Sequence, residues 1–82
     1  MYTVYILFSS SNDKYYVGHT SNLQDRLKRH NQGRSKSTKT GIPWEVVYTE
    51  IYNSKSEAYQ REMKIKKQKS RKYIEQLIKS LG

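Results

Sequence analysis

The fold is decided by residues 3–18, which have the sequence TVYILFSSSNDKYYVG. Residues 3–8 are β-branched, aromatic or aliphatic, a composition that is typical of a mostly buried strand. The polar segment that follows contains Asn12 and Asp13, two residue types that tolerate left-handed turn geometry. The strand pattern resumes at residues 15–18. The sequence therefore predicts an antiparallel hairpin.

Three helices are predicted after the hairpin. Ser21 with Gln24 fits a capping box that opens the first helix, and Gly33 is placed to end it. The second helix is predicted over residues 54–67, opened by another capping box. The third is predicted over 70–81, where apolar residues at i, i+3 and i+4 form one stripe. That stripe consists of Tyr73, Ile74, Leu77, Ile78 and Leu81.

A third strand is predicted over residues 44–52. Strict alternation along it would place Val46 and Tyr48 on one face and Val47 on the other. The predicted order β-β-α-β-α-α indicates an α+β fold, with a three-stranded antiparallel sheet flanked by helices. We expect residues 1–82 to form a single domain, since a chain of 82 residues supports one modest core.

The composition favours a folded cytoplasmic protein. Hydrophobic residues make up only 34 %, but eight Tyr, one Trp and one Phe can supply much of a small core. Cysteine is absent from the sequence, which excludes disulfides and thiolate metal sites. The N-terminal residues MYTVYILF do not have the pattern of a signal peptide, and no apolar run approaches the ~20 residues that cross a bilayer. We therefore expect no membrane association.

The charge balance favours a polyanionic partner. Sixteen Lys and Arg against seven Asp and Glu give a net charge of +9 at pH 7. Such an excess in a small domain with many aromatic residues is typical of nucleic-acid binding. A generic basic surface, as in small ribosome-associated proteins, is the alternative.

Two of the predicted helices carry polar residues on their apolar faces. In the first, Arg26 and His30 share a face with Leu23 and Leu27. There are two explanations. In the first, the methylenes of Arg26 cover the edge of the core beside a core-edge His30, and in the second, both residues belong to a functional site. In the second, helical spacing places Glu62 in the buried stripe. It is either one half of an ion pair or a metal-binding carboxylate, since Mg²⁺ commonly uses one or two carboxylates plus waters.

The hairpin contributes further polar groups. Tyr5 and Tyr16 lie on neighbouring predicted strands and could face each other, either as packing or as paired hydroxyls. Gly18 would permit the close approach of a backbone or a phosphate. His19, beside it, has a side chain that titrates near neutral pH.

In this order along the chain, these residues resemble the GIY-YIG nuclease superfamily, in particular its small stand-alone bacterial members. The first signature, Gly-Ile-Tyr, corresponds to residues 3–5 (Thr-Val-Tyr), and the second, Tyr-Ile-Gly, to residues 16–18 (Tyr-Val-Gly). Residues 20–30 resemble the family's helix with its arginine. Residues 56–62 resemble the segment with the metal-binding glutamate, and the resemblance spans residues 2–80.

The chain departs from the family pattern at three points. Thr3 replaces the glycine of the first signature, at a strand position. His19 stands where the larger repair members often carry a lysine. Those members also have an asparagine beyond the glutamate, whereas the last asparagine here is Asn53. The last two changes concern activity and the choice of substrate.

The resemblance implies a metal-dependent endonuclease that hydrolyses phosphodiester bonds in nucleic acid, with DNA as the favoured substrate. Glu62 would bind one Mg²⁺ or Mn²⁺ ion, and Arg26 would stabilise charge on the phosphate. Tyr5, or in second place His19, would orient or deprotonate the attacking water. The candidate catalytic residues are Tyr5, Tyr16, His19, Arg26 and His30. The candidate nucleic-acid-binding residues are Arg34, Lys36, Lys39, Lys64, Lys66 and Lys67.

Two other functions stay open at this point. A non-catalytic module on the same scaffold would bind nucleic acid without cutting it. A partner-binding domain would present the apolar face of the helix 70–81 to another protein. The sequence leaves the oligomeric state open, with a monomer as one possibility.

Overall fold

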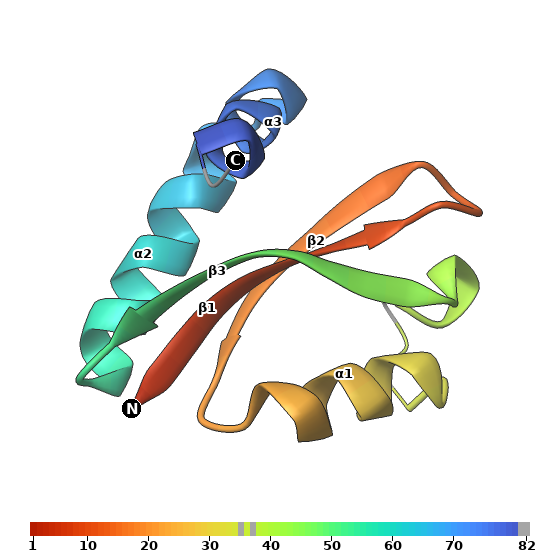
Figure 1. Ribbon diagram of the computed structural model, residues 1–82, viewed down its shortest axis with the longest axis horizontal. Coiled ribbons are helices and arrows are strands. Elements are labelled where there is room, and N and C mark those ends of the chain that lie inside the picture. Colours follow the sequence, from red (N-terminus) through yellow and green to blue (C-terminus); the bar gives the residue numbers. More distant parts are fainter. Residues whose placement is uncertain (35, 37, 81–82) are drawn as a thin grey trace.

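The computed structural model describes residues 1–34, 36 and 38–80, which fold as a three-stranded antiparallel sheet with three α-helices (Figure 1). The elements are β1 (Tyr2–Ser9), β2 (Lys14–Thr20), α1 (Leu23–Asn31), a 3₁₀ turn η1 (Lys39–Gly41), β3 (Trp44–Tyr52), α2 (Lys55–Lys67) and α3 (Arg71–Ser80). This confirms the predicted α+β class and the order of strands and helices. Leu81, predicted in the third helix, lies outside the described residues. No helix in the described part of the chain is long and apolar enough to span a membrane.

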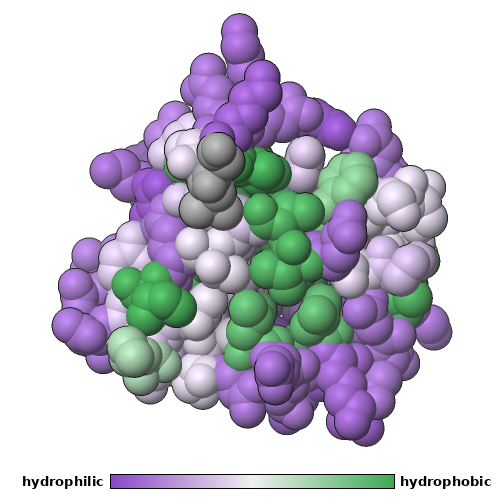
Figure 2. Space-filling view, in the orientation of Figure 1, coloured by the Kyte–Doolittle hydropathy of each residue, from purple (hydrophilic) through white to green (hydrophobic). Residues whose placement is uncertain are grey.

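The strand β1 is the middle strand of the sheet, in the order β2-β1-β3. Val4 and Ile6 pack with the core on the α2 and α3 side, whereas Tyr5 and Leu7 pack with residues of α1 on the other side. Figure 1 shows α1 on one side of the twisted strands and α2 with α3 on the other. Because both faces are covered, residues 4–8 of β1 are all apolar or aromatic and do not alternate with polar ones. On the face shown in Figure 2, apolar residues gather in the middle, with hydrophilic residues around them.

The predicted faces of β3 are wrong. Val46 pairs with Leu7 and Tyr48 pairs with Ile6, so Val46 and Tyr48 lie on opposite faces of the sheet. The pairing register shifts between Ile6 and Leu7, which leaves Val47 as the extra residue of a β-bulge. One inserted residue reverses the faces of every residue beyond it, because side chains alternate with a period of two.

The start of α1 also differs from the prediction. The N-cap is Asn22 and not Ser21, and its side chain accepts a hydrogen bond from the backbone N–H of Asp25 at 3.0 Å. Asparagine and serine are N-caps of similar strength, so residue preference alone could not decide between these two neighbours. The predicted end is confirmed, since Gly33 follows the helix with φ of 75°.

The caps of α2 and α3 agree with the prediction. The Ser54 hydroxyl accepts from the backbone N–H of Glu57 at 3.2 Å, which is one half of the predicted capping box, and it donates to the Glu57 carboxylate at 3.0 Å in place of the backbone bond of the other half. The Ser70 hydroxyl accepts from the backbone N–H of Tyr73 at 3.2 Å. Serine side chains therefore cap the N-termini of both helices.

A partly buried ion pair fixes α2 to β3. Arg61 donates from Nε and Nη2 to the two carboxylate oxygens of Glu50, at 2.8 and 3.1 Å. The hydroxyls of Tyr48 and Tyr52 donate to the same carboxylate, and Arg61 Nη1 donates to Tyr73 of α3. Burial alone would raise the pKa of Glu50, but the hydrogen bonds from these partners lower it to about 2. The network thus joins β3, α2 and α3.

This network predicts a loss of stability in acid. Because the pKa of Glu50 falls from its usual 4.5 to about 2 on folding, its contribution is present above pH 4.5 and is lost as the pH falls towards 2. We expect Glu50→Gln to lower the free energy of unfolding at pH 7 by roughly 2 kcal/mol or more and to flatten its decline in acid. Urea unfolding at pH 7, 4 and 3 measures both effects. The exposed Glu45 of the same strand supplies the control, Glu45→Gln, and a Glu50 variant that matches this control would contradict the prediction.

Candidate active site

Gly18 on the edge strand β2 lies directly opposite Tyr5 on β1, and the tyrosine ring covers it. A Cβ atom at Gly18 would lie 2.6 Å from the Tyr5 hydroxyl oxygen, so a side chain there would collide with the ring. Tyr16 pairs instead with Leu7, and its ring is a diagonal neighbour of Tyr5 at 6.4 Å between centroids. The expectation that Tyr5 and Tyr16 face each other directly is therefore corrected to a diagonal contact.

A buried chain of hydrogen bonds leads away from Tyr5. Its hydroxyl lies 3.2 Å from Nε2 of His30, whose Nδ1 lies 2.8 Å from the hydroxyl of Thr38. The Trp44 indole N–H donates to the Thr38 carbonyl oxygen at 2.7 Å, and the Tyr16 ring packs edge-on against His30 at 4.9 Å. Thr38 could not be identified from the sequence, because a threonine in a polar loop has no periodicity to mark it as buried.

The electrostatics keep both Tyr5 and His30 neutral. Burial lowers the pKa of His30, and the nearby Arg26 guanidinium lowers it further. Burial, Tyr16 and Glu62 raise the pKa of the Tyr5 hydroxyl, against an opposing effect of Arg26. A neutral imidazole has one donor and one acceptor nitrogen. His30 therefore donates one of its two hydrogen bonds, to Tyr5 or to Thr38, and accepts the other, and the histidine tautomer decides which.

The Glu62 carboxylate lies on the inner face of α2 and is 7 % exposed. Its Oε1 lies 2.6 Å from Nδ1 of His19, and its Oε2 accepts from Nζ of Lys66 at 2.6 Å. The Lys66 ammonium also lies 5.9 Å from the centre of the Tyr16 ring, so it reaches from α2 to β2. The buried residues of α2 are Ala58, Glu62 and Ile65, as helical spacing predicted.

Arg26 is half-buried on α1 and borders two grooves. One groove, of about 380 Å³, extends along α1 past Tyr16 and His30. The other, of about 320 Å³, extends to His19 and to Lys55 at the start of α2. The guanidinium therefore lies between the histidine of α1 and the histidine of β2.

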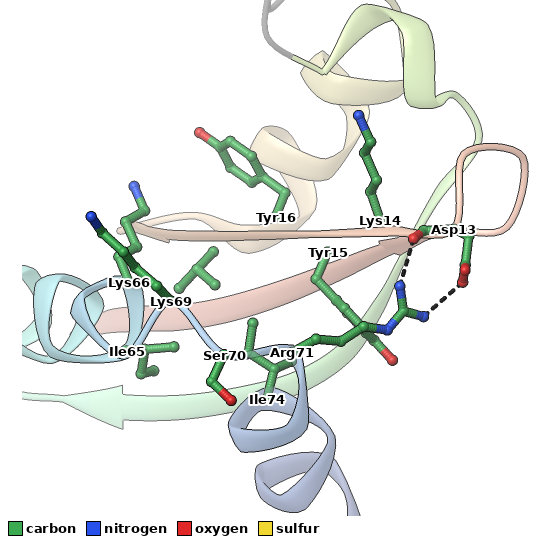
Figure 3. A pocket seen from close by; sticks show the side chains of 11 residues that line it. Asp13, Lys14, Tyr15, Tyr16, Ile65, Lys66, Lys69, Ser70, Arg71 and Ile74 are labelled. Carbon is green, nitrogen blue, oxygen red and sulfur yellow. Dashed lines mark hydrogen bonds and ion pairs between the residues drawn. The ribbon is translucent and has the colours of Figure 1, made fainter.

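A third groove, of about 450 Å³, lies on the α2 side of Tyr16 (Figure 3). Lys66 and Lys69 line it, and Arg71 lies at its far end, where its guanidinium donates to the carbonyl oxygen and the carboxylate of Asp13 at 2.8 and 2.7 Å. This groove meets the first one at Tyr16, since that ring borders both.

The predicted catalytic and metal-binding residues are linked around Tyr5: Tyr16 and His30 contact it, Arg26 and Glu62 act on the pKa of its hydroxyl, and His19 lies against Glu62. They come from both sides of the sheet: Tyr5, Tyr16 and His30 with Arg26 on the α1 side, His19 and Glu62 on the α2 side. Within residues 1–34, 36 and 38–80, no three His, Cys, Asp or Glu side chains gather into a metal site.

The predicted nucleic-acid-binding residues are more scattered. Arg34 borders the groove along α1, and Lys66 binds Glu62. The others are exposed: Lys36, Lys39, Lys64 and Lys67. Lys64 and Lys67 point away from Glu62, because they lie two and five positions beyond it on a helix of 3.6 residues per turn. The alternative that Glu62 is one half of an ion pair is confirmed, with Lys66, one helical turn away, as the basic partner.

Comparison with known proteins identifies this arrangement. Residues 1–74 match the family model described as the GIY-YIG catalytic domain. The chain belongs to the GIY-YIG family. At the level of the superfamily this implies an endonuclease-type hydrolase with a nucleic-acid substrate, and GIY-YIG nucleases generally use divalent metal ions.

Similar proteins from bacteria and archaea support the assignment. A UPF0213 protein of Staphylococcus haemolyticus is 43 % identical over 89 % of this chain and 93 % of its own length. A UPF0213 protein of Natronomonas pharaonis is 42 % identical over 77 % of this chain and 74 % of its own. The solution NMR structure of a UPF0213 protein from Bacillus halodurans superposes with a TM-score of 0.58, at 34 % identity, over 96 % of this chain and 84 % of that one.

The two GIY-YIG signatures meet in the hairpin of this chain. The tyrosine that ends the first signature, Tyr5, pairs with the glycine that ends the second, Gly18. The register therefore explains physically why a tyrosine and a glycine occur at these two positions: the ring needs the space that a side chain on β2 would occupy.

This contact predicts a strong coupling between the two positions. We expect Gly18→Ala to destabilise the protein by roughly 1–3 kcal/mol, because the methyl group forces the ring out of place. The same change should cost much less in a Tyr5→Ala background, where the ring is absent. Unfolding free energies of the two single variants, the double variant and the parent protein measure the coupling. Additive effects would contradict the close contact.

Proposed function

We propose that this protein, acting as a single GIY-YIG domain, is a metal-dependent endonuclease that hydrolyses phosphodiester bonds, with DNA as the favoured substrate. The observation that supports this most is that three kinds of group act together around the Tyr5 hydroxyl. These are the guanidinium of Arg26, the hydroxyl of Tyr5 with its histidine partner, and the carboxylate of Glu62. Hydrolysis of a phosphodiester needs such a set: a charge stabiliser, a proton acceptor and a ligand for a cation.

Glu62 is the residue that we propose holds the metal ion, Mg²⁺ or Mn²⁺. An ionised carboxylate has about four acceptor positions, and His19 and Lys66 use two of them. The Lys66 ammonium would have to move aside for the ion, because two cations on one carboxylate repel each other, and the 44 % exposure of this side chain leaves it room to do so. One carboxylate suits Mg²⁺, which keeps several waters and also binds substrate phosphate. When bound, the ion would polarise a phosphate oxygen as a Lewis acid.

Arg26 would hold the phosphate that is cut. A guanidinium offers a planar set of donors that matches two phosphate oxygens at once. Arg26 is half-buried between two grooves, where a charge is less screened by water than on an open surface. It would therefore stabilise the negative charge that builds up on the phosphate during attack.

Tyr5 and His30 would handle the proton of the attacking water as a pair. The Tyr5 hydroxyl is a poor base alone, because burial, Tyr16 and Glu62 raise its pKa. His30 is neutral and lies 3.2 Å away, so it can accept the tyrosine's proton when the tyrosine takes one from water. This assignment makes Nε2 the acceptor and has Nδ1–H donate to Thr38.

His19 and Tyr16 would support these groups. Because Nδ1 of His19 is hydrogen-bonded to Glu62, we assign His19 to holding the carboxylate in place and not to deprotonating water. The Tyr16 ring packs against His30 and carries the Lys66 ammonium near its face, so it fixes both neighbours.

One observation favours a non-catalytic nucleic-acid-binding module instead. The charge of Glu62 is already matched by Lys66, so the pair could serve the fold without any metal ion. The two functions predict different effects when the charge of the Glu62 carboxylate is removed: a loss of cleavage for a nuclease, and a loss of stability for a binding module.

If the protein is a nuclease, Glu62→Gln should abolish metal-dependent cleavage and leave nucleic-acid binding in place, since the amide keeps the volume and removes the charge that a cation needs. Cleavage of a labelled DNA with Mg²⁺, Mn²⁺ or EDTA measures this, with Glu45→Gln as the control. If Glu62 is only an ion-pair partner, the variant should lose stability and keep any activity and metal affinity of the parent protein.

Arg26→Lys separates charge from geometry. The lysine keeps the charge but loses the planar pair of donors, so we expect normal folding, retained DNA binding and a loss of roughly 10²-fold in cleavage rate. Single-turnover cleavage at saturating protein isolates the chemical step from binding. A loss below about threefold, under ~0.7 kcal/mol, would leave Arg26 with a packing role only.

A further inference from the structure

The groove along α1 carries more positive charge than the proposed chemistry uses. Beside Arg26, it is lined by Tyr16, Arg29, His30 and Arg34. None of these lining residues is acidic, and the volume is about 380 Å³. A concave surface with several guanidinium groups suits phosphate, because each guanidinium can donate two parallel hydrogen bonds to it.

The fold places Arg29 and Arg34 together at the end of α1. The backbone N–H of Arg34 donates to the carbonyl oxygen of Arg29 at 3.2 Å. Gly33 makes this possible with its φ of 75°, which turns the chain back against the helix that it ends. The turn thus adds Arg34 to the face that already holds Arg26 and Arg29.

Arg29 is available for a ligand. Its partner is Asp25, at 3.3 Å, and both side chains are about half exposed, at 53 % and 54 %. Such exposed pairs one helical turn apart contribute little, so a phosphate can replace the carboxylate at small cost. Arg26 and Arg29 are three residues apart, which makes them neighbours on the helix surface at about 5–6 Å between Cβ atoms.

We propose that Arg29 and Arg34 form a second phosphate subsite, which binds the phosphodiester next to the one that is cut, on the same strand. The inference rests on the proposed function, because it takes Arg26 to mark the cleaved phosphate. Neighbouring phosphates of a duplex strand differ by a rise of about 3.4 Å along the axis plus a sideways displacement, a step that adjacent arginine side chains can span. Two held phosphates fix the position of the strand, so these are positioning residues and not catalytic ones.

The test compares Arg29→Gln/Arg34→Gln with a control of equal charge loss, Lys28→Gln/Lys79→Gln. Both control lysines are exposed, and Lys28 lies two positions from Arg26, on another face of α1. The substrates are DNA oligonucleotides with one cleavage site, in which single phosphates are replaced by neutral methylphosphonates. Single-turnover cleavage over a range of protein concentrations gives the half-saturating concentration and the limiting rate separately.

For the parent protein and the control, neutralising one phosphate adjacent to the cleaved bond should raise the half-saturating concentration about tenfold, worth ~1.4 kcal/mol. The arginine variant should need about tenfold more protein on unmodified DNA, be insensitive to that replacement, and keep a limiting rate within about threefold. If the parent protein cleaves but no adjacent replacement matters, or the arginine variant stays as sensitive as the parent, the subsite is wrong and the nuclease function stands. If the parent protein cleaves no DNA or RNA with either metal ion, both proposals fail.

Discussion

The contact between the Tyr5 ring and the bare backbone of Gly18 is the constraint on which the rest of the site depends. Tyr5 belongs to the middle strand and Gly18 to an edge strand, so the ring extends from the core to the margin of the sheet. There its hydroxyl meets His30 from α1, and the charge of Glu62 from α2 is close enough to affect its pKa. Groups on opposite faces of a sheet are normally kept apart by the strands. They can act on one another here because the Tyr5 ring reaches the edge strand, where Gly18 has no side chain to block it.

Arg26 connects the electrostatics of this arrangement. Burial is the main reason that the pKa of His30 is lowered and that of Tyr5 is raised, and Arg26 strengthens the first shift and opposes the second. The same guanidinium therefore helps to keep the histidine an acceptor and makes the tyrosine easier to deprotonate. In the proposed mechanism it also holds the phosphate. Arg26 would then influence both the proton transfer and the stabilisation of charge on the phosphate. It is one of sixteen basic residues in a protein with a net charge of +9.

Local sequence patterns predicted the features that are set within a single helix, such as which of its residues are buried. The faces of α1 and α2 follow from a period of 3.6 residues, so the placement of His30 and Glu62 among apolar neighbours could be seen in advance. What depends on pairing or on the path of a loop could not be seen. The bulge at Val47 and the pairing of Tyr5 with Gly18 are set by register between strands. The loop that brings Thr38 to His30 has no periodicity, so only the folded chain identifies that contact.

The proposed nuclease activity requires one divalent ion bound at Glu62, the carboxylate that lies against His19. Titration of Mn²⁺ into ¹⁵N-labelled protein tests this most directly, because the unpaired electrons of the ion broaden the signals of amides near it. If the ion binds at Glu62, the amides of Gly18, His19 and Glu62 should broaden first and together. Broadening that begins at an exposed carboxylate such as Glu45 or Glu75, with the Gly18 amide unaffected, would contradict it.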